Sequence, residues 1–150
     1  ASMMAQAVFP KISRERNILF VNRVMFLVVG IVLLAYICVF IGSDQIVYFF
    51  TGKYMREASI IMRLLGISAI LVSFNTFIGG NRLVPMGYSS VYMKVMVGNC
   101  LFFLVGIGLL LLTHNINMYT VTVMVVTVEG FSFVSLVYRN WRLGLLRIKR

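Results

Sequence analysis

The sequence predicts an all-α fold, that of a polytopic membrane protein with four transmembrane helices. Three observations support this prediction: 61% of the 150 residues are hydrophobic, the apolar residues gather in long blocks, and basic residues flank those blocks. A soluble domain of this length has too much surface for its volume to hide so much apolar area. The bilayer is therefore the expected solvent, and we expect residues 1–150 to form a single membrane domain.

The apolar blocks have the length that a membrane span requires. Residues 24–41, 64–81 and 95–113 carry no charged side chain, and residues 116–138 carry only Glu129. At about 1.5 Å of rise per residue, a helix over each block reaches about 27 Å or more. This suffices for a hydrocarbon core of about 30 Å once the flanking residues snorkel, so the sequence predicts one span in each block.

The first ten residues predict the end of another helix. The apolar stretch AQAVFP stops at Pro10 and is followed by the charged turn KISRERN, as expected where a helix leaves the membrane. Residues 1–10 are thus interpreted as the stub of a preceding helix. The alternative is a short re-entrant or interfacial N-terminus.

The stretch between the first two spans, SDQIVYFFTGKYMREASIIMR, is too polar to cross a bilayer. Aromatic and basic side chains stand together in it, namely Phe49, Phe50, Lys53, Tyr54 and Arg56. Such a mixture is typical of a segment that lies in the membrane interface. The pair at positions 51–52, Thr-Gly, predicts a break within it.

The distribution of basic residues predicts the orientation. Lysines and arginines gather before the first span, between the second and third, and in a basic tail at residues 139–150 (Lys11, Arg14, Arg16, Arg23, Arg82, Lys94, Arg139, Arg142, Arg147, Lys149, Arg150). By the positive-inside rule these segments share the cytoplasmic side, and both termini are expected there. The net charge of +10 is accounted for in this way, without a nucleic-acid partner.

Polar residues at depth are the candidates for function, because an ionisable group inside a bilayer is costly and usually faces a cavity or a partner. Glu129 is the only acidic residue inside a predicted span. It could bind a coupling cation or a proton, or hold an arginine in place. The alternative is that it pairs with a basic neighbour such as Arg139.

The second span places small and polar residues on one helical face: Ser68, Val72, Asn75, Gly79 and Arg82. Such a face suits a wet lumen, and the planar fork of Arg82 suits a phosphate. The alternative is that Asn75 bonds a neighbouring helix and Arg82 marks the membrane boundary. At the other end, Arg63 either lines the lumen or reaches to the interface.

Residue types for catalysis are missing from the sequence. One aspartate and three glutamates are scattered along the chain, and there is a single histidine, His114. No paired carboxylates, nucleophile motif, phosphate-binding glycine loop or metal-ligand spacing is present. We therefore expect no enzyme, no metal site and no cofactor.

The order of several motifs resembles the C-terminal part of Wzx-type polysaccharide flippases of the MOP transporter superfamily. AVFPKISRERN is similar to the segment that ends their eighth helix. Gly52, Tyr54 or Met55, and Ala58 match, with altered spacing, a Gly-x-x-Tyr/Phe-x-x-Ala motif before the tenth. FNTFIGGNRLVPMGYSS, with its Asn75, Gly79 and Pro85, is similar to the passage into the eleventh.

The resemblance implies a two-lobed helix bundle that flips undecaprenyl-diphosphate-linked oligosaccharide across the bacterial inner membrane. This chain would supply helices nine to twelve, and its partners would be membrane lipid, the lipid-linked oligosaccharide and the N-terminal helices of the parent transporter. Candidate lumen residues are Arg63, Asn75, Arg82 and Glu129. Two alternatives stay open: a drug or cation antiporter of the same superfamily, with Glu129 as coupling residue, and a small four-helix membrane scaffold or accessory subunit.

Overall fold

The computed structural model describes residues 18–145, with side chains from residue 21 onward, and all regular structure in this part of the chain is helical. The expected stub at residues 1–10 and the end of the basic tail lie outside the described residues. The helices are α2 (Ile18–Thr51), α3 (Arg56–Asn75), the π-helix η1 (Thr76–Leu83), α4 (Ser89–Leu112) and α5 (Met118–Arg142).

The predicted all-helical architecture is confirmed. Four helices are long and apolar enough to cross a membrane: Val21–Thr51, Arg56–Leu83, Ser89–Leu112 and Met118–Arg142. The first two contain their charge-free blocks whole and extend past them, since short polar flanks continue a helix that the apolar block has formed. The last two extend past their blocks at one end only: α4 ends at Leu112, one residue before its block does, and α5 begins at Met118, two residues into its block. Helix α5 takes in the first residues of the basic tail, as far as Arg142.

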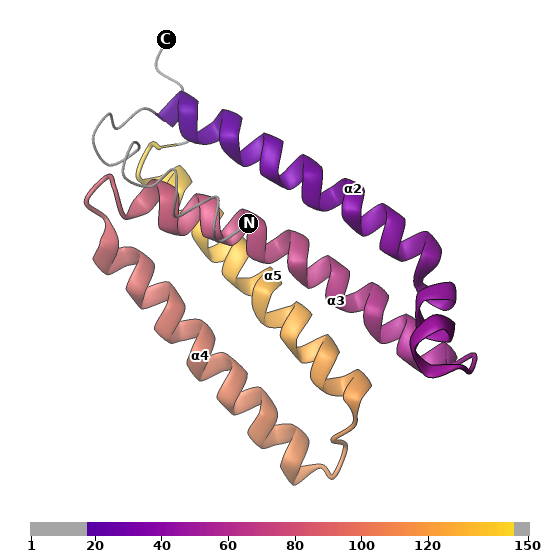
Figure 1. Ribbon diagram of the computed structural model, residues 1–150. Coiled ribbons are helices and arrows are strands. Elements are labelled where there is room, and N and C mark those ends of the chain that lie inside the picture. The colour runs from indigo at the N-terminus through magenta and orange to yellow at the C-terminus, as the bar shows by residue number, and fades with distance from the viewer. Residues whose placement is uncertain (1–17, 146–150) are drawn as a thin grey trace.

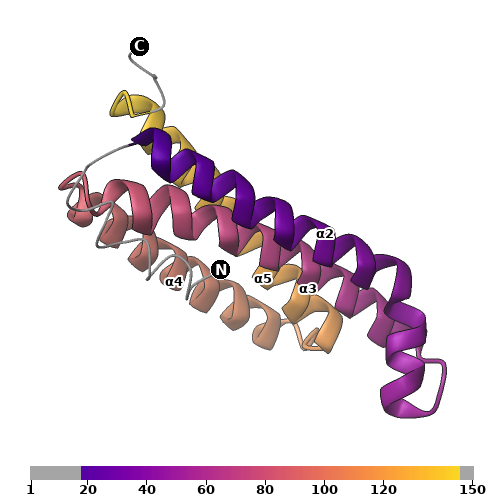
Figure 2. The same cartoon turned by 45° about the horizontal axis from the view of Figure 1, so that its top comes forward.

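The helices lie side by side in the order α2, α3, α5, α4 (Figure 1). Helix α3 contacts both α2 and α5, and α4 contacts α5. Consecutive helices run in opposite directions, as the turned view also shows (Figure 2). The described residues form this one group of helices, so the two-lobed arrangement stays a prediction.

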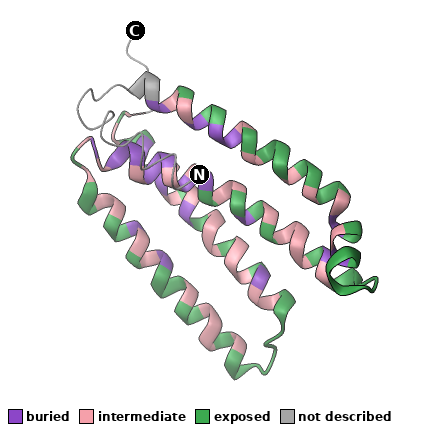
Figure 3. Cartoon of the chain, viewed as in Figure 1, coloured by how far each residue is buried: buried purple, intermediate pink, exposed green. Residues whose placement is uncertain are grey.

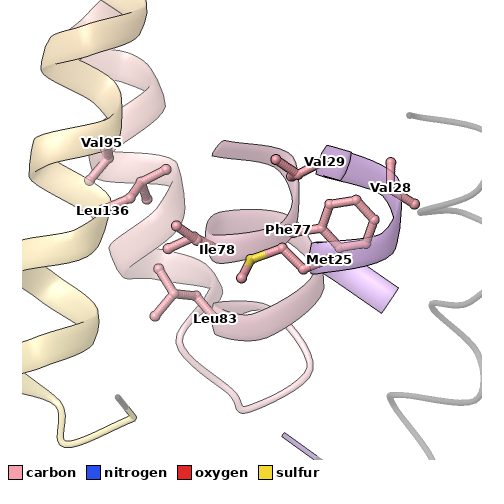
Figure 4. Packing of buried hydrophobic residues seen from close by; sticks show 8 residues of the cluster. All are labelled: Met25, Val28, Val29, Phe77, Ile78, Leu83, Val95 and Leu136. Carbon is pink, nitrogen blue, oxygen red and sulfur yellow. The ribbon is translucent and has the colours of Figure 1, made fainter. Parts of the chain in front are cut away.

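The buried core lies at one end of the group (Figure 3). This end, called the η1 end below, holds η1, the start of α2, the start of α4 and the end of α5. Figure 4 shows its apolar side chains, which come from all four of these segments: Met25, Val28, Val29, Phe77, Ile78, Leu83, Val95 and Leu136. Phe77, Leu83 and Leu136 are fully buried, so η1 stands at the centre of the packing.

Large apolar side chains cover the outside of the helices. Leu34 and Ile41 of α2, Leu104 of α4 and Val134 of α5 are all exposed. Monomeric soluble proteins rarely expose contiguous apolar surface of this kind. The four helices therefore suit a lipid environment, and we treat the chain as a multi-pass membrane protein.

The segment expected in the membrane interface is helical over its first part. Helix α2 continues through it to Thr51, and its last turns bend away from the axis of the rest (Figure 1). The last third of α2 contains a Gly-Ser pair at 42–43, and such pairs are a common cause of helix kinks. The predicted break is confirmed, because α2 ends at Thr51 and Gly52 adopts a φ of 68°, which favours glycine.

Candidate functional site at the η1 end

Buried polar side chains gather around the apolar core of the η1 end. They belong to the end of α3, η1, α4 and the second half of α5, namely Ser73, Asn75, Asn81, Arg82, Asn99, Ser132 and Asn140. Polar groups are expensive inside a protein unless they are hydrogen-bonded. So many of them in one small core predict a functional site.

The π-helix η1 continues α3 without a break. Asn75, where the two meet, has ordinary helical dihedrals of φ −58° and ψ −41°. The carbonyl of Ile78 within η1 accepts a hydrogen bond of 3.3 Å from Nδ2 of Asn140, which also donates to Leu136 of its own helix at 2.9 Å. Segments of π-helix are rare and frequently mark functional sites.

A glycine in η1 lets α4 approach closely. A Cβ atom added at Gly79 would collide with the ring of Tyr92 and press against Leu136. Tyr92 belongs to the first turn of α4, whereas Leu136 lies near the end of α5. Gly79 therefore brings three segments into contact at the centre of the polar cluster.

Asn75 and Glu129 join α3 to α5. Nδ2 of Asn75 donates to carboxylate Oε2 of Glu129 at 2.8 Å and to the backbone carbonyl of Glu129 at 3.2 Å. Asn75 is only 5% exposed, and Glu129 is half-buried. No basic group among the described residues lies within ion-pair distance of this carboxylate.

The alternative pairing of Glu129 with Arg139 is not formed. The two residues are ten positions apart on α5, about 15 Å along a helix, and Arg139 is exposed. Glu129 is therefore held by a neutral amide and not by a cation.

Arg82 is buried without a described counter-charge. It is 4% exposed, and its Nε atom has no hydrogen-bond partner. The single ion pair within residues 21–145 is that of Arg63 with Asp44. Burying a charge costs several kcal/mol unless a partner offsets the lost hydration, so Arg82 is the most unusual charged group of the described chain.

Five further buried polar atoms lack partners, and all lie near the η1 end: Asn75 Oδ1, Asn81 Nδ2, Asn99 Oδ1, Ser132 Oγ and Asn140 Oδ1. Each unsatisfied buried group costs about 1–3 kcal/mol. Donors and acceptors are both represented, so the cluster suits a polar ligand or water.

Arg63 lies far from this cluster, near the bend of α2. Its Nε donates to Oγ of Ser43 at 2.7 Å, its Nη2 lies 3.0 Å from Oδ2 of Asp44, and its Cζ lies 5.1 Å from the ring centroid of Phe40. All three partners, Phe40, Ser43 and Asp44, belong to α2. Arg63 thus joins α2 to α3, and the observed geometry favours a structural role over the lumen.

Of the four candidates named from the sequence, three lie in the half of the helix group that contains η1, namely Asn75, Arg82 and Glu129. Asn75 and Glu129 contact each other directly, and Arg82 follows in η1. Of the predicted polar face, Ser68 and Gly79 are also buried, whereas Val72 is exposed. Helical spacing also puts Ser132 on the stripe of Glu129, whereas sequence reasoning missed Asn81 and Asn140. The adjacent glycines at 79–80 were the one available signal that the helix is irregular there.

The described residues contain no group of three or more histidine, cysteine or acidic side chains that could hold a metal ion. Comparison with models of protein families, with curated proteins and with solved structures found no match.

Proposed function

We propose that the chain is the C-terminal part of a transporter that flips polyprenyl-diphosphate-linked oligosaccharide across the bacterial inner membrane for polysaccharide biosynthesis. The motif order, similar to that of Wzx-type flippases, and the four candidate spans support the proposal. One layer of four helices does not by itself enclose a transport lumen. The proposal therefore needs the N-terminal helices of the parent transporter to complete the lumen.

The observation that carries the proposal is the state of Arg82. The residue is 4% exposed, its Nε atom is buried without a partner, and no carboxylate of residues 21–145 lies within ion-pair distance of it. A diphosphate entering beside it would supply both the missing charge and the hydrogen-bond acceptors. Guanidinium groups bind phosphate through two parallel charge-assisted bonds, which lysine does not make.

The orientation belongs to the same proposal. With the positive-inside rule, the η1 end faces the cytoplasm, because Arg23, Arg82, Lys94 and Arg139 all stand at this end. In the proposed transport the lipid-linked diphosphate moves outward from that side. Arg82 would then meet the diphosphate at the start of its passage.

The test is polysaccharide export in cells that carry the full transporter with Arg82→Gln or Arg82→Lys. We expect Arg82→Gln to abolish surface polysaccharide, and Arg82→Lys to restore part of it because the charge remains. Arg23→Gln is the matched control, since it removes an exposed arginine from the same end. Full export by a normally inserted Arg82→Gln protein would sink the assignment.

A second candidate function is cation-coupled antiport, and Glu129 favours it. A half-buried carboxylate in a candidate span, bonded to an amide and without a described cationic partner, can take up a proton or a monovalent cation. In this case the transported substrate would be a drug or another cation.

This second function predicts that Glu129→Gln removes the dependence of efflux on a proton or sodium gradient. Glu57→Gln, which changes an exposed glutamate at the opposite end, should leave that dependence unchanged. Gradient-driven efflux that persists in Glu129→Gln would exclude antiport through this residue.

A further inference from the structure

A cavity of about 350 Å³ lies where α4 begins and α5 ends, apart from Arg82 and Glu129. It is lined by Val91 of α4, by Tyr138, Arg139 and Arg142 of α5, and by Leu143 just beyond. Two arginines thus share a small cavity with apolar walls. None of the residues assigned to transport above lines it.

The two arginines form one cationic face. Arg139 and Arg142 are three positions apart on α5, so their side chains stand on the same side of the helix. No carboxylate among residues 21–145 lies within ion-pair distance of either one. The start of α4 adds to the positive potential, because Tyr88 provides no side-chain cap for its free N–H groups.

Aromatic side chains indicate the depth of this cavity. The rings of Tyr138 and Trp141 lie 6.4 Å apart, and Trp141 is 66% exposed. Tryptophan and tyrosine are enriched where the hydrocarbon core meets the headgroups. The cavity therefore lies at headgroup level, where its apolar wall can contact acyl chains and its arginines can contact phosphate.

We propose that this cavity binds the phosphate of an anionic phospholipid headgroup. Basic pockets between transmembrane helices near the surface recognise such headgroups. The apolar walls of Val91 and Leu143 favour a lipid over a soluble anion. The site is separate from the transported diphosphate, because Arg82 does not line it.

The experiment is native mass spectrometry of the full-length protein, purified from mixtures of phosphatidylglycerol and phosphatidylcholine. The wild-type protein should retain phosphatidylglycerol preferentially. Arg139→Gln/Arg142→Gln should lower this preference at least about tenfold, the loss expected for one charge-assisted hydrogen bond. Both arginines are exposed, so the variant should fold, and circular dichroism checks that it does.

The matched control is Arg23→Gln/Lys94→Gln, which removes two exposed charges from the same end but none from the cavity. It should keep the preference for phosphatidylglycerol. An equal loss in both double variants would mean diffuse attraction and would overturn the proposal, as would an unchanged preference in Arg139→Gln/Arg142→Gln. Displacement of the lipid by inorganic phosphate would assign the cavity to a soluble anion instead.

Discussion

At the scale of single residues, the contact of Asn75 with Glu129 links the two central helices through one side-chain amide. The amide satisfies the carboxylate and a backbone carbonyl at once, while its own Oδ1 stays without a partner. Hydrogen bonds to charged groups contribute about 1.5–3 kcal/mol. This pair is therefore a local source of stability as well as a candidate for ion coupling.

Removing the amide should destabilise the protein. We expect Asn75→Leu to lower the free energy of unfolding by about 1–3 kcal/mol, because the carboxylate of Glu129 loses its donor. Glu129→Gln should cost less, since its side-chain oxygen still accepts from Asn75. Denaturant unfolding in micelles, followed by circular dichroism, measures both. Wild-type stability of Asn75→Leu would contradict the role given to the contact.

Alanine substitutions at the adjacent glycines 79 and 80 test how closely η1 packs against α4. Gly79→Ala should destabilise the protein by about 1–3 kcal/mol, because the new methyl group would overlap the ring of Tyr92 and would also press against Leu136. Gly80→Ala is the matched control, as nothing lies within 4 Å of its added Cβ. Its cost should be close to zero or negative. Equal effects in the same unfolding assay would argue against close packing at Gly79.

At the scale of the elements, α2 is attached to α3 at both ends of its length. Its first turns pack on η1 in the core, and its bend is tied by the contacts of Arg63 with Ser43 and Asp44. The ion pair is partly exposed, with 34% of the Arg63 side chain accessible. Exposed pairs of this kind contribute about 0–1 kcal/mol and weaken with salt.

Asp44→Asn should therefore lower the unfolding free energy by no more than about 1 kcal/mol. The difference from the wild-type protein should shrink as sodium chloride is raised, because salt screens an exposed charge pair. A loss that is larger and independent of salt would instead mean that Arg63 is desolvated. It would then return to the set of lumen candidates.

The four spans could be predicted from sequence because lipid imposes a strong rule. Every backbone group must be satisfied within the segment, so a long charge-free block becomes a helix. The π-helix could not be predicted in this way. It depends on the packing of Phe77 and Leu83 and on the bond from Asn140, which lies 62 positions from its acceptor, Ile78.

Part of the candidate site could also be predicted from the sequence. Helical spacing placed Asn75 and Arg82 on one face, and depth in an apolar block marked Glu129. The sequence did not reveal which of these residues would meet. Arg63 was a lumen candidate because the sequence alone does not reveal its partners. Ser43 and Asp44 come near it only when α2 and α3 fold back on each other.

At the scale of the whole molecule, the four helices are long and apolar enough to cross a membrane, and large apolar side chains cover their outside. Trp141 is the single tryptophan, is exposed, and lies at the end of α5. Its intrinsic fluorescence therefore reports membrane depth directly.

In vesicles, we expect lipids brominated near the headgroup to quench Trp141 more strongly than lipids brominated near the chain end. Leu104→Trp in a Trp141→Phe background should show the reverse, because Leu104 is an exposed residue in the middle of α4. Equal quenching profiles for the two proteins would contradict the membrane placement of the helices.

The central claim is that buried Arg82 receives a lipid-linked diphosphate, and direct binding tests it most closely. The measurement is the affinity of a short-chain polyprenyl diphosphate for the full-length protein in detergent, with Arg82→Gln and Arg23→Gln beside the wild type. The account predicts binding at least about tenfold weaker in Arg82→Gln and unchanged binding in Arg23→Gln. Equal affinity of all three proteins would contradict it.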